Sequence, residues 1–202
     1  MPIILTALVS LVLAFNLPVF YERAKISVIE SGTLLSHDER LVRVRPGLAL
    51  LILSAGVLPV WFMTHSPGLT GFVLLLGCVA YIDYLTRWVP DPFIYSLLWL
   101  ALSTPELDGG YPAPFLWGAA VIIAPALLLN MGSFLRRMPP VLASGDVYVL
   151  PAVGVWLSPQ HAALCISLSL LSALIMSRWW LEVPFVTVLY VIFTGVILWA
   201  RI

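Results

Sequence analysis

Long apolar runs separated by short polar segments constrain the fold of this chain more than any other feature. They recur from Ile3–Phe20 near the start to Phe185–Ala200 near the end. A helix needs roughly 20 predominantly apolar residues to cross the hydrocarbon core of a bilayer. The sequence therefore predicts an all-α, polytopic membrane protein with about eight transmembrane helices.

The expected helices are bounded by polar residues and prolines. Proline lacks the amide donor and restricts the residue before it, so Val89-Pro-Asp-Pro92 should break a helix. The fourth and sixth runs are short for spanning helices. We predict one transmembrane domain over residues 1–202, with a first cytoplasmic loop at 21–45. The eight runs are Ile3–Phe20, Pro46–Thr64, Leu69–Leu85, Phe93–Leu102, Ala113–Phe134, Asp146–Leu157, Ala162–Met176 and Phe185–Ala200.

Composition excludes several other classes of protein. The chain is 61% hydrophobic and 10% charged, with a mean hydropathy of +1.05, which excludes a soluble domain. It has no basic stripe with which to bind nucleic acid. Cys78 and Cys165 lie inside apolar runs without a Cys-x-x-Cys pair, and the three histidines lack ligand spacing. We therefore expect buried or lipid-facing thiols and no metal site.

Basic residues follow the odd-numbered runs and so indicate the orientation of the chain. Cytoplasmic loops of membrane proteins carry an excess of lysine and arginine. We therefore predict eight helices, with these loops on the cytoplasmic side and both termini periplasmic. Of the 10 Lys and Arg residues, only Arg201 departs from this pattern, and the others are Arg23, Lys25, Arg40, Arg43, Arg45, Arg87, Arg136, Arg137 and Arg178.

Two aspartates are conspicuous because a charge at the edge of a bilayer is costly unless it faces protein, water or a partner. Asp83 lies near the end of the third run, and Asp146 begins the sixth. The predicted layout puts both at the cytoplasmic face. Two carboxyl groups in a poorly hydrated site tend to share one proton, so one can take a proton from water while the other donates one. This arrangement can hydrolyse a peptide bond without a metal or a nucleophilic side chain.

Structural roles are an alternative explanation of the same residues, and on these residues alone they are favoured. An aspartate in the first turn of a helix commonly caps free amides, which applies to Asp146. Asp83 can pair with Arg87, four residues further along the same helix. Asp91, between two prolines, is expected mainly as a turn residue. Gly145 lets another backbone come close, or adopts a backbone conformation that other residues avoid.

Three sequence elements resemble, in order, those of the type IV prepilin peptidase family. Ile82-Asp-Tyr-Leu-Thr-Arg-Trp-Val-Pro-Asp91 is similar to the family's first motif, where an Asp precedes an Ile/Val-Pro-Asp element by several residues. Ala143-Ser-Gly-Asp146 resembles its Gly-x-Gly-Asp motif, which other intramembrane aspartyl proteases share. Val183-Pro-Phe185 resembles a Pro-Phe element at the head of the last helix. The resemblance covers about residues 68–202, which we take as the core peptidase region.

The resemblance implies catalytic roles for Asp83 and Asp146. Ala143 replaces the first Gly of the motif, and Tyr148 stands where the family often has Lys. Residues 22–45 also lack the two Cys-x-x-Cys pairs of many relatives that methylate the new amino terminus with S-adenosylmethionine. That cofactor is implied by the resemblance alone, and proteolysis is expected to need none. Supporting roles fall to Ala143, Gly145, Pro90, Asp91, Pro184 and Phe185.

The sequence thus predicts an aspartyl endopeptidase of the bacterial inner membrane, active at the cytoplasmic face. Its expected partners are membrane lipid and a prepilin or pseudopilin, from which it removes a short basic leader ahead of an apolar helix. Two other functions stay open. One is an ion-coupled transporter in which the two acids relay ions, although no symmetric hydropathy repeat is seen. The other is a catalytically silent scaffold for pilus or secretion assembly.

Overall fold

The computed structural model describes residues 2–30, 43–107, 112–180 and 182–200 of the chain. All regular structure in these ranges is helical, which confirms the prediction of an all-α fold. The helices are α1 (Pro2–Glu30), α2 (Pro46–Thr64), α3 (Pro67–Thr86), α4 (Asp91–Leu107), α5 (Pro112–Leu135), α6 (Ser144–Gly154), α7 (Pro159–Met176) and α8 (Phe185–Trp199).

In the described ranges, 5 helices are long and apolar enough to cross a membrane. These spans lie in α1, α2, α3, α5 and α7, and α8 is a shorter apolar helix. Helix α6 has 11 residues, and at about 1.5 Å per residue it covers about half of a hydrocarbon core that is about 30 Å thick. The polytopic membrane architecture is therefore confirmed, whereas eight full crossings are not shown. Asp146, in the first turn of α6, lies outside these spans.

Prolines, serines and left-handed residues set the helix ends. α2, α3 and α7 each have proline in the first turn, where its missing N–H costs nothing. Ser66 and Ser158 cap α3 and α7 by accepting a backbone N–H from the first turn. His65 and Arg87 follow α2 and α3 in the left-handed conformation, with φ of 50° and 56°.

Some helix bounds differ from the apolar runs. α1 continues to Glu30 rather than ending at Phe20, and α4 covers Asp91–Leu107 rather than 93–102. An apolar run marks the residues that suit lipid, whereas a helix continues for as long as its backbone bonds can form. α6 ends earlier than expected, at Gly154.

The expectation that Asp91 serves mainly as a turn residue is wrong, because it begins α4, where a negative charge suits the helix dipole.

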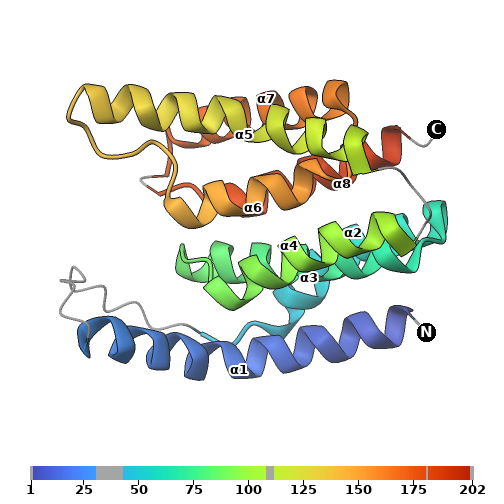
Figure 1. Ribbon diagram of the computed structural model, residues 1–202. Coiled ribbons are helices and arrows are strands. Elements are labelled where there is room, and N and C mark those ends of the chain that lie inside the picture. The colour runs from blue at the N-terminus through green and yellow to red at the C-terminus, as the bar shows by residue number, and fades with distance from the viewer. Residues whose placement is uncertain (1, 31–42, 108–111, 181, 201–202) are drawn as a thin grey trace.

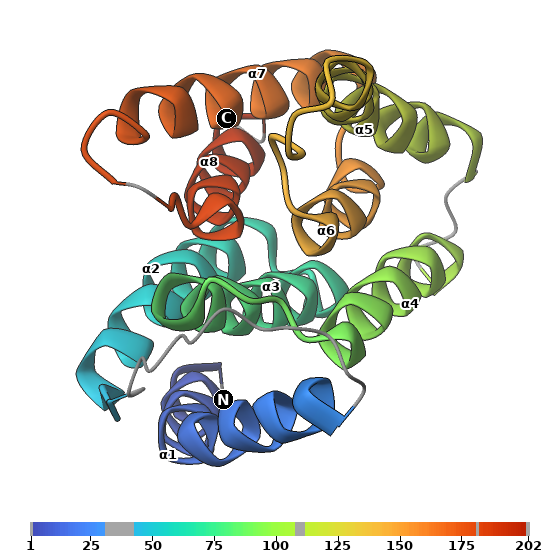
Figure 2. The same ribbon diagram turned by 90° about the vertical axis from the view of Figure 1, so that its left-hand side faces the viewer.

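Helix α3 lies at the centre of the arrangement. It packs against α1, α2, α4 and α8, while α6 packs against α4, α5 and α8. Figure 1 shows the start of α1 and the end of α8 at one end of the bundle, and the α5–α6 linker at the other. In the end-on view of Figure 2, α5 and α7 cover α6 and α8 on the side away from α1. The end of α3 and the starts of α6 and α8 therefore meet at the end where the linker lies.

Aromatic side chains join the helices in the core. Phe72 of α3 contacts the rings of Trp156 and Phe193, with ring centroids 5.4 and 5.7 Å apart. The hydroxyl of Tyr190 on α8 donates to the carbonyl oxygen of Ile52 on α2 at 3.0 Å. These contacts fix α8 against α2 and α3, and so fix the start of α8 beside the end of α3.

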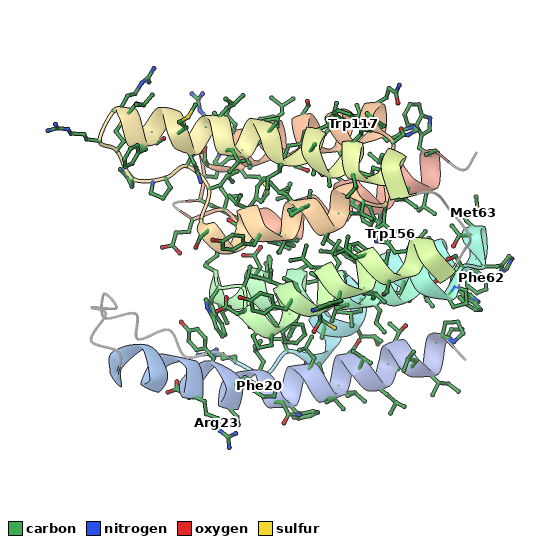
Figure 3. The ribbon with its side chains drawn as sticks, viewed as in Figure 1. Phe20, Arg23, Phe62, Met63, Trp117 and Trp156 are labelled. Atoms are coloured by element: carbon green, nitrogen blue, oxygen red, sulfur yellow. The ribbon has the colours of Figure 1, made fainter. Side chains whose placement is uncertain are left out.

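Large apolar side chains also cover the outer surface, as expected for helices in contact with lipid. Phe20 on α1 and Phe62 and Met63 on α2 are exposed and project away from the bundle in Figure 3. Soluble monomers rarely expose large contiguous apolar surface. The outer face therefore supports the membrane assignment made from the helix lengths.

Candidate active site

Asp83 is buried in the last turn of α3, with 3% of its surface exposed. Its carbonyl oxygen accepts the N–H of Arg87 at 2.9 Å, and Arg87 turns into the left-handed conformation that ends the helix. A buried carboxyl group needs hydrogen-bond donors, because losing water without a replacement is costly. The donors for this one come from another helix.

Thr187, at the start of α8, supplies these donors. Its backbone N–H donates to Oδ2 of Asp83 at 3.0 Å, and its Oγ1 lies 3.2 Å from the same oxygen. Oγ1 also donates to the carbonyl oxygen of Ala80 at 2.8 Å. Pro184, the N-cap residue of α8, makes no side-chain cap bond. Asp83 therefore caps α8 from a different helix, since the first N–H groups of a helix have no partner within it.

Asp146 is half-buried in the first turn of α6. Burial raises its pKa from 3.8 to about 7, the negative charge of Asp83 adds to this rise, and the backbone of Ala143 acts in the opposite direction. The interaction between two charges falls with distance. The charge of Asp83, at the end of α3, thus acts on Asp146 at the start of α6. Their catalytic role stays a prediction.

Close packing seats the start of α6 against the segment between α3 and α4. A Cβ atom added to Gly145 would lie 3.3 Å from Cβ and 3.8 Å from the carbonyl oxygen of Val89, which is itself buried. The backbone of Gly145 is not in the left-handed region. Of the two roles predicted for this glycine, the structure shows the close approach and not the unusual conformation.

Asn130 of α5 holds the linker that leads to Asp146. Its Nδ2 donates to the carbonyl oxygen of Leu142 at 2.9 Å, and its Oδ1 accepts the N–H of Leu142 at 3.0 Å. The side chain of Leu142 is buried as well. Helix α6 starts two residues later, at Ser144. Asn130 therefore positions Asp146 through the backbone.

The remaining predicted site residues lie at the same helix ends. Pro90 is buried, and its carbonyl oxygen accepts two backbone N–H groups from the first turn of α4. Pro184 and Phe185 are buried at the start of α8. Ala143 is the exposed N-cap residue of α6, and Asp91 is exposed at the start of α4. The two prolines and Phe185 thus help to build the end of the bundle that holds the two aspartates.

The structural alternatives for the aspartates are partly supported. Asp146 is the third residue of α6 and interacts with the backbone of Ala143, its N-cap residue. This corresponds to one half of a capping box. The positive charge of Arg87 acts on Asp83. Both aspartates therefore have structural contacts in addition to the effect of Asp83 on Asp146.

Arg87 also contacts aromatic rings. Its guanidinium carbon lies 5.9 Å from the ring centroid of Tyr84 and 5.5 Å from that of Trp180. At these distances a cation is attracted by the faces of the rings. The pairing of Asp83 with Arg87 that the spacing allowed is therefore not the main contact of the Asp83 carboxyl group, which is bonded by α8.

The cysteines lie apart from these contacts. Cys78 on α3 and Cys165 on α7 are buried free thiols, as predicted. Over the part of the chain that the structure describes, no three His, Cys, Asp or Glu side chains are grouped as a metal site would require.

Sequence analysis did not identify Thr187 or Asn130. Thr187 follows the predicted Pro184-Phe185 element directly, but nothing local indicates that it meets a residue 104 positions earlier. Asn130 did offer a signal. An amide within an apolar run needs hydrogen-bond partners, because leaving it unpaired in an apolar surrounding is costly.

The fold and the site define a helical membrane protein in which two carboxyl groups interact at one end of the bundle. The chain belongs to the type IV leader peptidase family, whose model matches residues 70–200. The resemblance to prepilin peptidases is thereby confirmed, and the protein is a peptidase of the leader peptidase type. The matched range includes both aspartates, Asn130 and Thr187. Comparison with curated proteins and with solved structures gave no match.

Proposed function

We propose that the protein is an aspartic endopeptidase that removes the short basic leader of a type IV prepilin or pseudopilin. The observation that carries this proposal is that the start of α6 packs against the segment after α3, with Gly145 against Val89, and that the charge of Asp83 helps to raise the pKa of Asp146. Membership of the leader peptidase family supports the same reaction. A shared proton between two acids is the arrangement that aspartic proteases use.

In this proposal the two carboxyl groups divide the work of hydrolysis. The ionised one takes a proton from water, and the water oxygen attacks the scissile carbonyl carbon. The protonated one gives its proton to the leaving nitrogen as the C–N bond breaks. The raised pKa of Asp146, about 7, favours a state with one proton on the pair near neutral pH.

The location of the pair suits a substrate with an apolar helix behind its leader. The end of α3 and the starts of α6 and α8 lie at one end of the bundle (Figure 1). A substrate helix can stay in lipid while its leader reaches the aspartates. Arg136 and Arg137 follow α5 at this same end, which supports a cytoplasmic position at the inner membrane.

Methylation of the new amino terminus is a separate prediction that rests on the family resemblance. S-adenosylmethionine would supply the methyl group when bound. Residues 22–45 lack the cysteine pairs of the methylating relatives, so proteolysis and methylation need to be measured as separate events.

The test is incubation of the purified protein with a prepilin, with and without S-adenosylmethionine, followed by intact-mass analysis. The wild type should release the leader, and Asp83→Asn or Asp146→Asn should each lower the rate by about a thousandfold or more. Asparagine at position 83 still offers an oxygen to Thr187, so α8 keeps its cap. Glu22→Gln, at an exposed acid on α1, is the matched control and should leave the rate unchanged.

The outcomes separate this proposal from its rivals. Near-normal processing by either asparagine variant would refute it. Absence of cleavage by the inserted wild type, together with aspartate-dependent ion flux into liposomes, would indicate a transporter. A mass gain of one methyl group that requires S-adenosylmethionine would add the methyltransferase activity.

A further inference from the structure

The hydroxyl of Thr187 lies between two oxygen atoms that both act as acceptors. Oγ1 is 2.8 Å from the carbonyl oxygen of Ala80 and 3.2 Å from Oδ2 of Asp83. A hydroxyl group carries one proton and can also accept. Both oxygens can accept this one proton, and a negative charge on Asp83 favours its donation to Oδ2.

Two arrangements satisfy these atoms. When Asp83 is ionised, the Thr187 hydroxyl can turn toward Oδ2 and donate to it. When Asp83 is protonated on Oδ1, the Thr187 hydroxyl can turn back and donate to the carbonyl oxygen of Ala80. In both arrangements the backbone N–H of Thr187 stays bonded to Oδ2 at 3.0 Å. Rotation of one hydroxyl therefore accommodates both protonation states without moving a helix.

We propose that Thr187 is a positioning residue that holds Oδ2 of Asp83 with its backbone N–H, stabilises the ionised carboxylate with its hydroxyl, and thereby makes Asp83 the base of the pair. Oδ1 is then the oxygen that exchanges a proton with the attacking water. Asp146 is left as the acid that protonates the leaving nitrogen. The inference rests on the proposed proteolytic function, which does not itself decide between the two assignments.

The surroundings of the two aspartates support this order. Oδ2 of Asp83 accepts the backbone N–H of Thr187 at 3.0 Å and lies 3.2 Å from its hydroxyl oxygen, and Arg87 lies one turn further along the same helix. Hydrogen bonds and an opposite charge favour the ionised form of a carboxyl group. Burial and then the negative charge of Asp83 raise the pKa of Asp146, and the backbone of Ala143 opposes this rise.

Other helices packed against α3 also carry charged residues. Those at described positions on or beside α1, α2 and α4 include Glu22, Arg23, Arg45 and Asp91. None of these is among the groups that act on Asp83. The groups that do act on Asp83 belong to α8 and to the end of α3.

The test compares Thr187→Val, which keeps the branched shape and the backbone N–H, with Thr187→Ser, which keeps the hydroxyl. For Thr187→Val we expect kcat to fall by about ten- to a hundredfold with KM within about twofold, because the lost bond goes to a charged group. The acidic limb of the pH profile of kcat should move up by about one pH unit, and the basic limb should stay. Thr187→Ser should restore both values to within about threefold of the wild type.

Thr194→Val is the matched control on the same helix. Thr194 is buried, and its hydroxyl bonds only within α8, to the carbonyl oxygens of Tyr190 and Val191 at 3.0 and 2.9 Å. It should leave both limbs of the pH profile in place. An unchanged acidic limb in Thr187→Val, or a shift of the basic limb instead, would overturn the inference.

An infrared titration measures the protonation of Asp83 directly, without any cleavage assay. It can be applied to a second variant, Thr187→Ala, as well as to Thr187→Val. In the Asp146→Asn background, the carboxyl C=O band that Asp83→Asn removes reports the protonation of Asp83. Thr187→Val and Thr187→Ala both remove the hydroxyl. Each should move the midpoint of the titration of this band to higher pH by about one unit. An unmoved midpoint in a folded variant overturns the role of Thr187. If the midpoint moves but the wild type does not cleave a prepilin, the proposed function fails and the contact stands.

Discussion

Replacement of Asp146 by asparagine should stabilise the folded protein at alkaline pH, although it removes a predicted catalytic group. The raised pKa sets the sign of this effect. Below about pH 4 the carboxyl group is protonated in the folded and unfolded states alike. Between about pH 4 and 7 the unfolded state ionises first, so stability falls as the pH rises, and above about pH 7 the full cost is present. Asparagine cannot ionise and avoids this cost.

The magnitude follows from the same values. A rise from 3.8 to about 7 corresponds to at most about 4 kcal/mol, since a tenfold change in proton affinity is worth about 1.4 kcal/mol. Asp146 is only half-buried, so water reaches the carboxyl group and reduces this figure. We expect Asp146→Asn to gain about 1–2 kcal/mol over the wild type at pH 8.5, relative to the difference between them at pH 4.5.

The assay is equilibrium unfolding of the purified protein in detergent micelles at both pH values, followed by circular dichroism. Glu22→Gln, at an exposed acid, serves as the control and should show no such gain. A second measurement repeats the comparison in the Asp83→Asn background, where the gain should shrink because one of its two causes is gone. A difference between Asp146→Asn and the wild type that does not change with pH would refute the reasoning. An equal gain with and without the charge at position 83 would show that the two aspartates are not neighbours.

Two further predictions concern the packing that positions the site. Asn130→Leu removes both hydrogen bonds to the backbone of Leu142, so we expect a loss of about 2–3 kcal/mol in unfolding experiments and slower prepilin processing at a temperature where the variant is folded. Gly154→Ala places a Cβ atom 2.6 Å from the Cα atom of Ala119, and should cost about 1–3 kcal/mol by overpacking α5 against α6. Gly132→Ala, also inside a helix but with nothing within 4 Å of the added atom, is its control and should stabilise the protein by up to about 1 kcal/mol, because alanine favours the helix over glycine.

The helical architecture could be predicted because lipid imposes a strong local rule. Backbone groups in a bilayer must bond within their own segment, so long apolar runs become helices. The break at Pro90 was predictable for a related reason, since proline cannot continue the hydrogen-bond ladder. Helix lengths could not be predicted in the same way. The apolar run ends at Phe20, but α1 continues through polar residues to Glu30. Hydropathy therefore predicts which residues lie in the membrane better than it predicts where a helix ends.

The two aspartates of the candidate site could be predicted from the sequence, whereas the residues that bond to them could not. Asp83 and Asp146 are costly in an apolar chain, and that cost is visible in the sequence alone. Thr187 is an ordinary residue for an apolar helix, because its hydroxyl can bond to a carbonyl oxygen of the preceding turn. Its bond to Asp83 depends on the packing of α8 on α3. The sequence therefore identifies a group that needs a partner, while the fold decides which residue becomes that partner.

The two aspartates lie at the ends of different helices, and this can give two identical side chains different affinities for a proton. Burial disfavours charge on both aspartates, whereas the start of a helix favours negative charge through its free N–H groups and its dipole. Asp83 receives the N–H and the hydroxyl of Thr187 from the start of α8. Asp146 belongs to the first turn of its own helix and receives only the opposing effect of Ala143. The cap provided from a second helix therefore makes the surroundings of the two aspartates unequal, and this inequality is the basis for proposing Asp83 as the base of the pair.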